Sequence, residues 1–494
     1  MKKYVVALDQ GTTSSRAIAF DKKGRPAAAA NVEFKQIFPK PGWVEHDPEE
    51  IFNSQMKALE LMIKDSDISA EEIDSIGITN QRETVMMWDT KTGMPIYNAI
   101  VWQCRRTAPI CEKLIEDGYT DLIKKKTGLV PDAYFSGTKI KWLLENVPKA
   151  KELLKKGQLM TGTVDTWLMY RMSEGEVHVT DATNASRTML FNIEKGSWDE
   201  ELCEILDIPL EILPEVVDSS GEIFKFKLDG VQIPVAGIAG DQQAALFGQT
   251  CYEMGESKNT YGTGCFILMN TGYNPVYSDK GLLTTVAWKI NGRMEYALEG
   301  SVFNAGSTIQ WLRDNLGFME NSADSQAMAE SVQDSGGVYF VPAFTGLGTP
   351  YWDMYARATI SGITRGTTKE HIVRAGLEAI AYRSTEVLDV MIKDTGIKPC
   401  KLYVDGGASA NDFLMQFQSD MLGCDIVRPV VRETTARGAA FLAGLATGFW
   451  DSKETLDKLV ETDRIFTPNT TQESRDSKLE GWRRAIAGSK ANLG

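Results

Sequence analysis

One local pattern opens both halves of this chain: a run of β-forming residues, a turn rich in glycine and threonine, and a second strand. Residues 3–9 are mostly apolar, and the turn at 10–15 leads into the alternating run 16–21. In the second half, the Gly/Thr turn at 259–264 is followed by the apolar run 265–269. Strand-like runs separated by a short turn predict β-hairpins. Because both halves then alternate strands and helices, we expect two copies of one fold.

The length of the chain supports this division. The chain has 494 residues, whereas a single hydrophobic core stops growing at about 250–300 residues. We place the boundary near residues 246–256 and predict two α/β lobes, 1–250 and 251–494. Each lobe is expected to be a mixed β-sheet flanked by helices, and a deep cleft between the lobes is expected to hold the active site.

Capping signals predict where several helices begin. Asp47 is followed by Pro48 and two acidic residues, which predicts a helix from about residue 48. Residues 367–370 read Thr-Thr-Lys-Glu, a capping-box pattern that predicts the start of a long helix. A further helix is expected from about Asn411.

Composition excludes several classes of protein. The formal net charge is −14 and no Lys/Arg-rich run is present, so we expect no nucleic-acid partner. The apolar run after Lys2 and Lys3 ends at Asp9, too early for a signal peptide. No stretch approaches the ~20 apolar residues of a membrane-spanning helix. We therefore expect a cytoplasmic protein with no integral membrane segment.

Cysteine and histidine spacing bears on metal sites and redox chemistry. The seven cysteines are scattered, and no Cys-x-x-Cys spacing occurs. This pattern is typical of reduced thiols in a cytoplasmic protein. The chain has three histidines, far apart in the sequence, so a His/Cys zinc site is not expected.

Three Gly-rich turns beside strands are candidates for binding phosphate, at residues 9–13, 262–264 and 405–407. Glycine lets backbone N–H groups approach phosphate oxygens, and threonine hydroxyls add donors. Each turn alone is better explained as a tight turn, but the three together favour a nucleotide-binding cleft. The Gly-x-x-x-x-Gly-Lys-Ser/Thr loop is absent, and no Gly-x-Gly-x-x-Gly opens a helix after a strand.

Four further residues are candidates for chemistry, each with a structural alternative. Asp241 follows a strand beside a glycine, where an aspartate can act as a general base or metal ligand, or equally as a helix N-cap. Arg82 and Glu83 form either a solvated loop or a pair held in a pocket between two apolar runs. Trp102 is either a core aromatic residue or part of that pocket.

Ordered motifs over nearly the whole chain resemble the FGGY family of carbohydrate kinases, in the actin-like ATPase superfamily. Residues 9–16 resemble the family's first phosphate loop, and residues 41–46 and 80–84 are similar to segments of those members that act on glycerol. The remaining similar segments are 134–146, with Tyr134, Phe135, Ser136, Lys139, Trp142, Glu145 and Asn146, then 240–243 and 405–407.

This resemblance implies ATP-dependent phosphorylation of glycerol to sn-glycerol 3-phosphate, with Mg²⁺, by two actin-like (ribonuclease H-like) lobes. The residues implied to contact glycerol are Arg82, Glu83, Trp102, Tyr134, Asp241, Gln242 and Phe266. The residues implied to contact the nucleotide are Thr12, Thr13, Ser14, Arg16, Thr263, Gly306, Gln310, Gly407 and Asn411. Asp241 is implied to be the catalytic base, and both Asp9 and Asp241 are implied to lie near the magnesium ion.

Alternatives to this interpretation stay open. One is a kinase for another small polyol or a sugar such as a ketopentose, although Arg82, Glu83 and Trp102 argue against a larger substrate. Another is an actin-like filament protein or a chaperone-type ATPase, and a third is a silent sugar sensor. The expected assembly is a homo-oligomer, a dimer or a tetramer, which the sequence does not fix.

Overall fold

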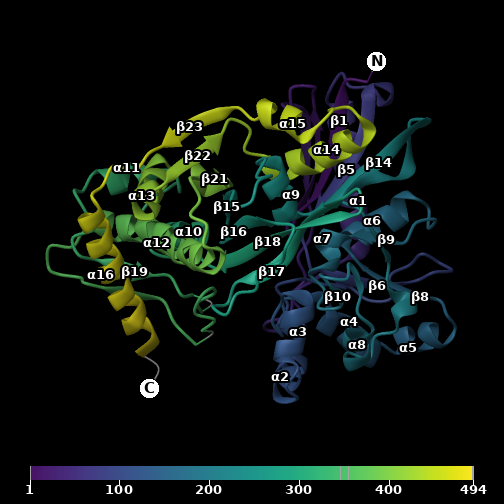
Figure 1. Ribbon diagram of the computed structural model, residues 1–494, viewed down its shortest axis with the longest axis horizontal. Helices are drawn as coiled ribbons and strands as arrows, with labels where there is room; N and C mark the ends of the chain where they lie inside the picture. Colours follow the sequence, from purple (N-terminus) through teal and green to yellow (C-terminus); the bar gives the residue numbers. More distant parts are fainter. Residues whose placement is uncertain (1, 345, 354, 492–494) are drawn as a thin grey trace.

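A computed structural model describes residues 2–344, 346–353 and 355–491 of the chain. Its main feature is one mixed sheet of 13 strands, in the order β23-β22-β21-β15-β16-β18-β17-β13-β14-β5-β1-β2-β3. Strands from the first half of the chain occupy one end of this order, and strands from the second half occupy the other. Figure 1 shows the two groups on opposite sides of the molecule, and α14, from the second half of the chain, lies against β1 and β5 of the first-half group.

The strands of the main sheet fall into two groups. The first-half strands are β1 (Tyr4–Gln10), β2 (Ser14–Phe20), β3 (Pro26–Glu33), β5 (Ile73–Asn80), β13 (Ser220–Leu228) and β14 (Val231–Gly240). The second-half strands are β15 (Ser257–Tyr261), β16 (Cys265–Gly272), β17 (Leu283–Ile290), β18 (Arg293–Val302), β21 (Lys401–Asp405), β22 (Asp425–Pro429) and β23 (Thr462–Phe466).

Both predicted hairpins around the Gly/Thr turns are confirmed. β1 and β2 pair antiparallel with Asp9 opposite Arg16, and β15 and β16 pair antiparallel with Thr260 opposite Phe266. The two halves are not separate sheets, however, because β13 and β17 pair in parallel at Ser220 and Ile290. The two strands meet at this one residue pair, where the first-half and second-half groups join.

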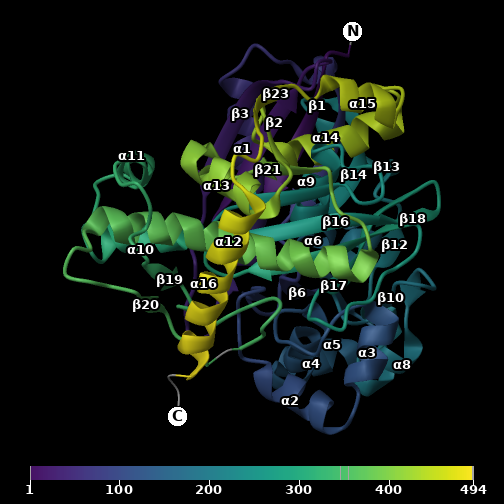
Figure 2. The ribbon, with the colours of Figure 1, turned by 60° about the vertical axis from the view of Figure 1, so that its left-hand side comes forward.

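The helices are α1 (Pro48–Lys64), α2 (Ala108–Glu116), α3 (Thr120–Thr127), α4 (Ser136–Asn146), α5 (Pro148–Lys155), α6 (Val164–Met172), α7 (Ala182–Ala185), α8 (Glu200–Ile205), α9 (Asp241–Gly248), α10 (Gly306–Asp314), α11 (Asp324–Glu330), α12 (Lys369–Thr395), α13 (Asp412–Leu422), α14 (Thr434–Thr447), α15 (Lys453–Leu459) and α16 (Gln472–Ala491). Figure 2 shows α12 as the longest of them, running across the second-half group.

Capping explains where two of these helices begin. Asp47 caps α1 by accepting a hydrogen bond from the Glu49 amide at 2.9 Å, as predicted. The capping box of α12 lies one residue later than predicted. Thr368 is the N-cap, and the His371 side chain, three residues on, accepts from its amide at 3.2 Å. The sequence pattern points to Thr367 because Glu370, three residues later, is the usual carboxylate partner of a capping box, whereas the structure uses His371.

Helices α9 and α14 pack unusually closely where the two halves meet. A Cβ atom added at Gly438 would lie 1.8 Å from the Ala244 carbonyl oxygen, and one added at Gly248 would lie 2.0 Å from that of Thr434. Only glycine permits this approach of two backbones. Because α9 begins at Asp241, this packing fixes where that residue lies.

Smaller sheets complete the fold. Four strands form a second sheet in the order β4-β7-β6-β8, with bounds β4 (Glu45–His46), β6 (Val85–Asp89), β7 (Ala99–Ile100) and β8 (Leu159–Thr163). The remaining pairs are β9 (Val179–Asp181) with β12 (Glu215–Val217), β10 (Phe191–Asn192) with β11 (Ser197–Trp198), and β19 (Tyr339–Val341) with β20 (Thr359–Ser361).

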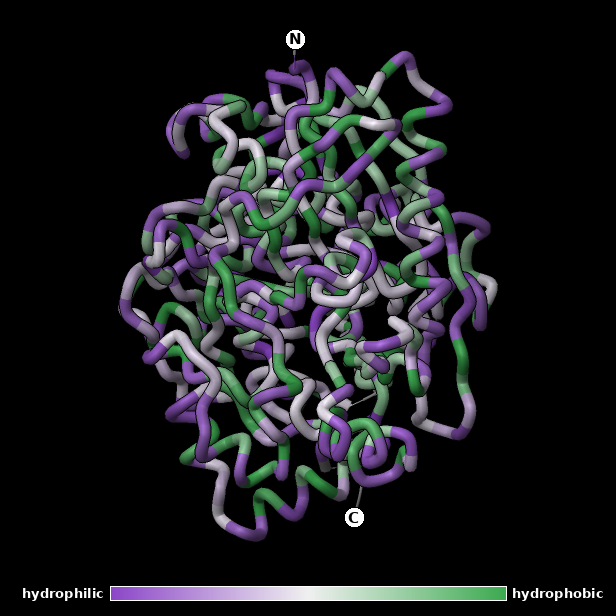
Figure 3. Tube along the Cα trace, turned by 90° about the vertical axis from the view of Figure 1, so that its right-hand side faces the viewer, coloured by the Kyte–Doolittle hydropathy of each residue, from purple (hydrophilic) through white to green (hydrophobic). Residues whose placement is uncertain are grey.

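Each half has its own apolar core. Trp88 and Trp167 pack in the first, with ring centroids 5.2 Å apart, and Tyr382 stacks on Trp482 in the second at 5.1 Å. Figure 3 shows hydrophobic and hydrophilic stretches alternating along the trace. Among the described residues, no helix is both long and apolar enough to span a membrane.

Candidate active site

Arg82 is the centre of the candidate site. It follows β5 and is only 3% exposed, which rules out the solvated-loop alternative. Its two terminal nitrogens donate to the Glu299 carboxylate at 2.5 and 3.1 Å. Its Nε lies 3.2 Å from the Asp241 carboxylate, and Nη2 is 3.3 Å from the Tyr134 hydroxyl. The structure therefore brings together three of the residues predicted to bind the polyol.

Glu83 is held in the same cluster by a residue that sequence reasoning missed. Arg187, which follows α7, donates from Nε to Glu83 at 2.7 Å and from Nη2 to Glu299 at 2.9 Å. All three side chains are buried. Glu83 has φ of 61°, in the left-handed region that residues with a side chain rarely adopt. Such backbone strain is concentrated at functional sites.

Two arginines and two glutamates thus form a ring of ion pairs, which we call the charge cluster: Arg82, Glu83, Arg187 and Glu299. Burial opposes ionisation of Glu299, but the adjacent Arg187 and Arg82 outweigh it and lower the pKa of Glu299 to about 2. For Glu83, burial dominates over both arginines and raises the pKa. Glu299 is therefore the firmly ionised member, and Glu83 is the more readily protonated one.

Asp241 is the most accessible acid beside the charge cluster, with its side chain about one-third exposed. It occupies the first helical position of α9, and the N-cap is Gly240, so the N-cap alternative is wrong. Its carboxylate accepts hydrogen bonds from the amide and the side chain of Gln242, at 2.8 and 3.2 Å. A partly exposed carboxylate held at a helix start can receive a proton from a bound hydroxyl.

Gln242 is oriented by a second residue that the sequence did not reveal. The buried Lys258 on β15 donates to the Gln242 side-chain oxygen and to the Thr260 hydroxyl, the latter at 2.9 Å. Burial lowers the pKa of Lys258 to about 8, although Asp405 and Asp241 partly oppose this shift. Lys258 lies in the first strand of a hairpin, and no neighbouring residue in the sequence indicates that it contacts the site.

Trp102 connects the polyol residues to the first Gly-rich turn. Its ring nitrogen donates to the Thr12 hydroxyl at 3.0 Å, and its ring packs edge-on against Tyr134 with centroids 5.6 Å apart. Trp102 is only partly buried, unlike the core aromatic residue of the alternative interpretation. Lys139, buried beneath, donates to the carbonyl oxygens of Tyr134 and Phe135 and so fixes the Tyr134 backbone.

Phe266 lies on the same sheet face as Glu299. On β16 it stands opposite Thr260 of β15 and Ser301 of β18, and Glu299 is two residues from Ser301. Residues two apart on a strand share a face. Phe266 is partly exposed, which leaves its ring accessible to a ligand.

The first Gly-rich turn has a defined backbone shape. The Gly11 amide donates to the Ser14 carbonyl at 2.9 Å, and Gln36 holds the Thr12 carbonyl at 2.9 Å. Thr13 is exposed and Ser14 is partly exposed. Arg16 on β2 is half-exposed and pairs at 2.9 Å with Glu433, the residue before α14, in the other half of the chain. The turn is therefore linked to both halves.

Asp9, at the end of β1, lies within electrostatic range of Asp241. Loss of hydration raises the pKa of Asp9 to about 7; Arg16 opposes the shift, and Glu433 and Asp241 add to it. A cation bound beside Asp9 would relieve the repulsion that Asp241 exerts on its carboxylate. Among the described residues, no group of three or more His, Cys, Asp or Glu is placed to hold a metal ion.

The second and third Gly-rich turns lie side by side. β15 and β21 pair in parallel with Thr260 opposite Asp405, so the turns that follow them emerge at the same edge. The Thr263 carbonyl accepts from the amides of Ala305 and Ser307, which ties the start of α10 to the second turn. Gly306 and the exposed Gln310 belong to α10.

The third turn runs from Asp405 into α13. Gly406 has φ of 81°, and a Cβ atom there would lie 2.5 Å from the Tyr261 carbonyl oxygen, so glycine is required. Gly407 is exposed, and Asn411 caps α13 by accepting from the Leu414 amide at 3.0 Å. The sequence predicted a helix start at Asn411, and the structure confirms it. The predicted nucleotide residues of the second half thus share one edge of the sheet.

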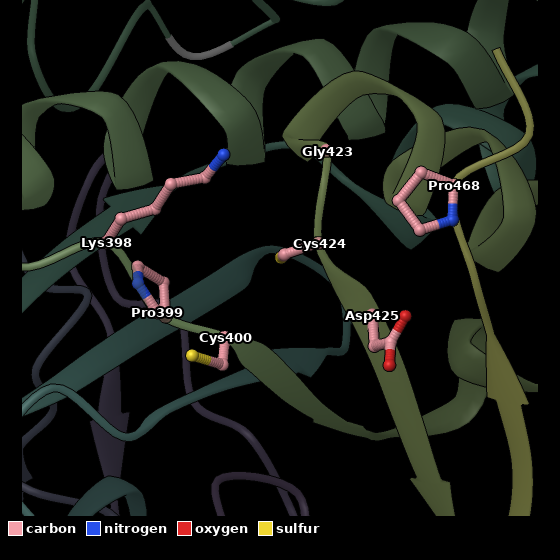
Figure 4. A pocket seen from close by; sticks show the side chains of 7 residues that line it. All are labelled: Lys398, Pro399, Cys400, Gly423, Cys424, Asp425 and Pro468. Atoms are coloured by element: carbon pink, nitrogen blue, oxygen red, sulfur yellow. The ribbon is translucent and has the colours of Figure 1, made fainter.

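A separate pocket lies at the other end of β21 and β22 (Figure 4). Its lining residues are Lys398, Pro399, Cys400, Gly423, Cys424, Asp425 and Pro468. None of these residues belongs to the predicted polyol or nucleotide sets. Its position at the amino ends of the strands, opposite the Gly-rich turns, separates it from the candidate active site.

Comparison with known proteins gives consistent results. Residues 4–248 match the N-terminal domain, and residues 257–447 the C-terminal domain, of the FGGY family of carbohydrate kinases. The chain is 58% identical over 488 residues to "Glycerol kinase 2" of Thermotoga maritima and 59% identical over 489 residues to "Glycerol kinase" of Thermoanaerobacter sp.. Each alignment covers 98% of both chains.

Solved structures show the same fold. The crystal structure of Plasmodium falciparum glycerol kinase with ADP superposes with a TM-score of 0.91 at 38% identity, covering 98% of both chains. A ligand-bound xylulose kinase from Lactobacillus acidophilus superposes with a TM-score of 0.88 at 24% identity, covering 99% of both chains. The second similarity concerns the fold alone.

Proposed function

The chain belongs to the FGGY family of carbohydrate kinases, and from this premise we propose that it transfers the terminal phosphoryl group of ATP to glycerol, giving sn-glycerol 3-phosphate. The observation that carries the proposal is the buried charge cluster beside Tyr134 and the more exposed Asp241. We propose lobe boundaries of 1–250 and 251–494. With these boundaries, the residues proposed to bind glycerol come from both lobes, because Phe266 lies in the second.

Recognition of glycerol follows from the chemistry of these side chains. Glycerol is small and carries a hydroxyl on every carbon, so a selective site must give each hydroxyl a buried partner. Arg82 supplies donors in a fixed plane, and Glu83 supplies acceptors. Tyr134 and Gln242 supply both kinds of group. Trp102 and Phe266 are proposed to pack on the carbon chain.

Asp241 is proposed as the base for the reacting hydroxyl. Its carboxylate accepts the hydroxyl proton as the oxygen attacks the terminal phosphorus of ATP, and ADP leaves. Phosphoryl transfer needs mainly alignment and charge stabilisation from the protein, together with closure that excludes water. The nearby arginine keeps the Asp241 carboxylate oriented without covering it.

The nucleotide is proposed to lie along the three Gly-rich turns. The residues assigned to it are Thr12, Thr13, Ser14, Arg16, Thr263, Gly306, Gln310, Gly407 and Asn411. Asp9 and Asp241 would hold Mg²⁺, which neutralises phosphate charge when bound. Two carboxylates fit this ion, because Mg²⁺ in kinases is held by one or two carboxylates plus phosphates and water.

A cytoplasmic location and a homo-oligomeric state, a dimer or a tetramer, stay predictions. The competing function is phosphorylation of another polyol or sugar. The similarity to glycerol kinases at 58–59% identity favours glycerol.

A substrate panel tests the assignment. ADP release by the purified protein with MgATP would be compared for glycerol, a ketopentose, a sugar acid and water. We expect kcat/KM for glycerol to exceed that of every other substrate by at least about 100-fold, because buried polar groups reject ligands that leave them unpaired. A higher kcat/KM for a ketopentose would overturn glycerol as the substrate.

A further inference from the structure

Glu299 comes from the opposite half of the chain to the residues it binds. It lies on β18, within residues 257–447, whereas Arg82 and Arg187 lie within residues 4–248. Its carboxylate accepts hydrogen bonds from both terminal nitrogens of Arg82 and from one nitrogen of Arg187. The orientation of the proposed glycerol-binding arginine is thus set by a residue of the second half.

We propose that Glu299 and Arg187 are positioning residues, which hold Arg82 and Glu83 in the orientation that binds glycerol and so make the polyol site depend on both halves of the chain. This inference rests on the proposed function. Neither residue needs to touch glycerol.

The geometry of the hydrogen bonds supports a positioning role. A carboxylate that accepts two parallel bonds from one guanidinium fixes the plane of that group, which a single bond does not. Without Glu299, the nearest anions to Arg82 are Asp241 at 3.2 Å and Glu83 at 3.8 Å. We expect Arg82 then to turn toward these two acids and cover the proposed base.

Arg187 lies beside Tyr134 as well as between the two glutamates of the charge cluster. Its Nη1 is buried and has no hydrogen-bond partner within the part of the chain that the structure describes. Its guanidinium also lies near the Tyr134 ring, 5.6 Å from the centroid. Arg187 is therefore placed between Glu83, Glu299 and Tyr134, where loss of its charge disturbs three neighbours at once.

The test compares Glu299→Gln with Glu378→Gln. Glu378 on α12 is also buried and also paired with an arginine, Arg374 at 2.9 Å, but it lies outside the site. We expect Glu299→Gln to raise the KM for glycerol at least about 10-fold and to change the KM for ATP less than about 2-fold, because misplacement of binding groups is costly. Glu378→Gln should lower Tm without changing the glycerol KM.

Equal Tm losses in both variants with an unchanged glycerol KM would overturn the proposal. If Glu299→Gln does not fold, Arg187→Lys gives the same test. Lysine keeps the positive charge but lacks the planar guanidinium that donates to both Glu83 and Glu299. A crystal structure of the variant without ligand separates this inference from the proposed function. Arg82 should rotate away from its wild-type position even if glycerol is not the substrate, and an unmoved Arg82 would contradict the positioning role.

A second inference concerns two cysteines that line the pocket of Figure 4. Lys401 and Asp425 are paired on the parallel strands β21 and β22, and Cys400 and Cys424 are the residues immediately before them. Neighbouring strands lie about 4.8 Å apart, within the Cα separation that a disulfide spans. Figure 4 shows both cysteines at the same end of the two strands. Cys400 is exposed and Cys424 is 9% exposed.

The structure assigns Cys400 and Cys424 as a thiol pair that forms a reversible disulfide when a small-molecule disulfide is the oxidant. The exposed Cys400 thiolate attacks the oxidant and releases one thiolate, leaving a mixed disulfide. The Cys424 thiolate then attacks the Cys400 sulfur, forms the internal disulfide and releases the second thiolate. The bond closes a loop that contains the third Gly-rich turn and α13.

Oxidised glutathione is the probe. After treatment, wild-type protein should lose the mass of two hydrogen atoms, with one disulfide-linked peptide containing both residues, and its Tm should rise by several degrees because loop closure constrains the unfolded chain. Cys424→Ser should instead retain one glutathione, and Cys400→Ser should retain none. Accumulation of the glutathione adduct on wild-type protein, or a linkage between other cysteines, would overturn the assignment.

Discussion

The charge cluster and the Gly-rich turns differ in burial and in the chemical groups that they offer to a ligand. Arg82, Glu83 and Glu299 are buried side chains that already bind one another, whereas Thr13, Thr263 and Gly407 are exposed residues in turns. The polyol set has its donors and acceptors in place before any ligand is present. The turns offer mainly backbone N–H groups, which would bind the negatively charged phosphates of the nucleotide.

This difference indicates that the charge cluster mainly determines specificity, whereas the turns mainly contribute affinity. A buried, ion-paired site tolerates little change, because one lost partner leaves a charge uncompensated. An exposed turn shares its binding among many weak contacts, so one lost hydroxyl has a small effect. We therefore expect single substitutions to act strongly at the charge cluster and at Asp241 beside it, and weakly at the turns.

The largest effect is expected at Asp241. Asp241→Asn keeps the shape of the side chain but removes its basicity, and loss of a general base typically costs about 10²–10⁴ in rate. We predict that kcat falls by that factor while Tm changes little. Asp199→Asn is the matched control, since Asp199 also stands at a helix start but serves as the N-cap of α8. Near-full kcat in Asp241→Asn would remove its role as base.

Arg82→Lys should have the next largest effect. Lysine keeps the charge but cannot give two parallel hydrogen bonds to Glu299. We predict a fall of about 10–100-fold in kcat/KM for glycerol, with a much smaller change for ATP. Steady-state kinetics with each substrate varied in turn would measure both. Parallel changes in the two KM values would mean that Arg82 has a structural role only, and Arg374→Lys provides the control.

His46 lies between the first Gly-rich turn and the charge cluster, and the pH dependence of stability tests its role there. It is buried between Gln36, which holds the first turn, and Gln81, which precedes Arg82. Burial lowers the pKa of His46 from 6.5 to about 4. Because the unfolded chain binds this proton more readily, the contribution of His46 to stability is present above pH 6.5 and is lost as pH falls toward 4.

We predict that the free energy of unfolding falls by about 1–3 kcal/mol more in wild type than in His46→Gln between pH 6.5 and pH 4. Urea denaturation at several pH values would measure it. Identical slopes for the two proteins would show that His46 is not the titrating group.

The smallest effect is expected in the second Gly-rich turn. Thr263→Ala removes one exposed hydroxyl but keeps the backbone carbonyl that accepts from Ala305 and Ser307. We predict a rise of about 2–5-fold in the KM for ATP and none in the KM for glycerol, since one exposed hydrogen bond contributes about 0.5–1.5 kcal/mol. A change as large as that of Arg82→Lys would break the comparison.

The sequence predicted features whose signals are local. The hairpins around both Gly/Thr turns, the Asp47 cap and the strand-end position of Asp241 each depend on a few adjacent residues. Arg82 and Glu83 stood out because opposite charges interrupt two apolar runs. Their roles, and those of the nucleotide residues, came from the resemblance to the family rather than from spacing.

Features that depend on distant contacts were not predicted. Arg187 and Glu299 are separated by more than 100 positions and meet only in the folded chain. Glu299, between Leu298 and Gly300 in β18, was a usable signal, because an unpaired buried charge is too costly to occur without a reason. The β13–β17 pairing that joins the two halves had no counterpart in any local pattern.

Product identification by ³¹P NMR tests the central claim most directly. The purified protein would be incubated with MgATP, with and without glycerol, until part of the ATP is consumed. The account predicts a phosphomonoester signal of glycerol 3-phosphate equal in amount to ADP, and almost no ADP without glycerol. Release of ADP with inorganic phosphate, at the same rate whether or not glycerol is present, would contradict it and identify an ATPase instead of a kinase.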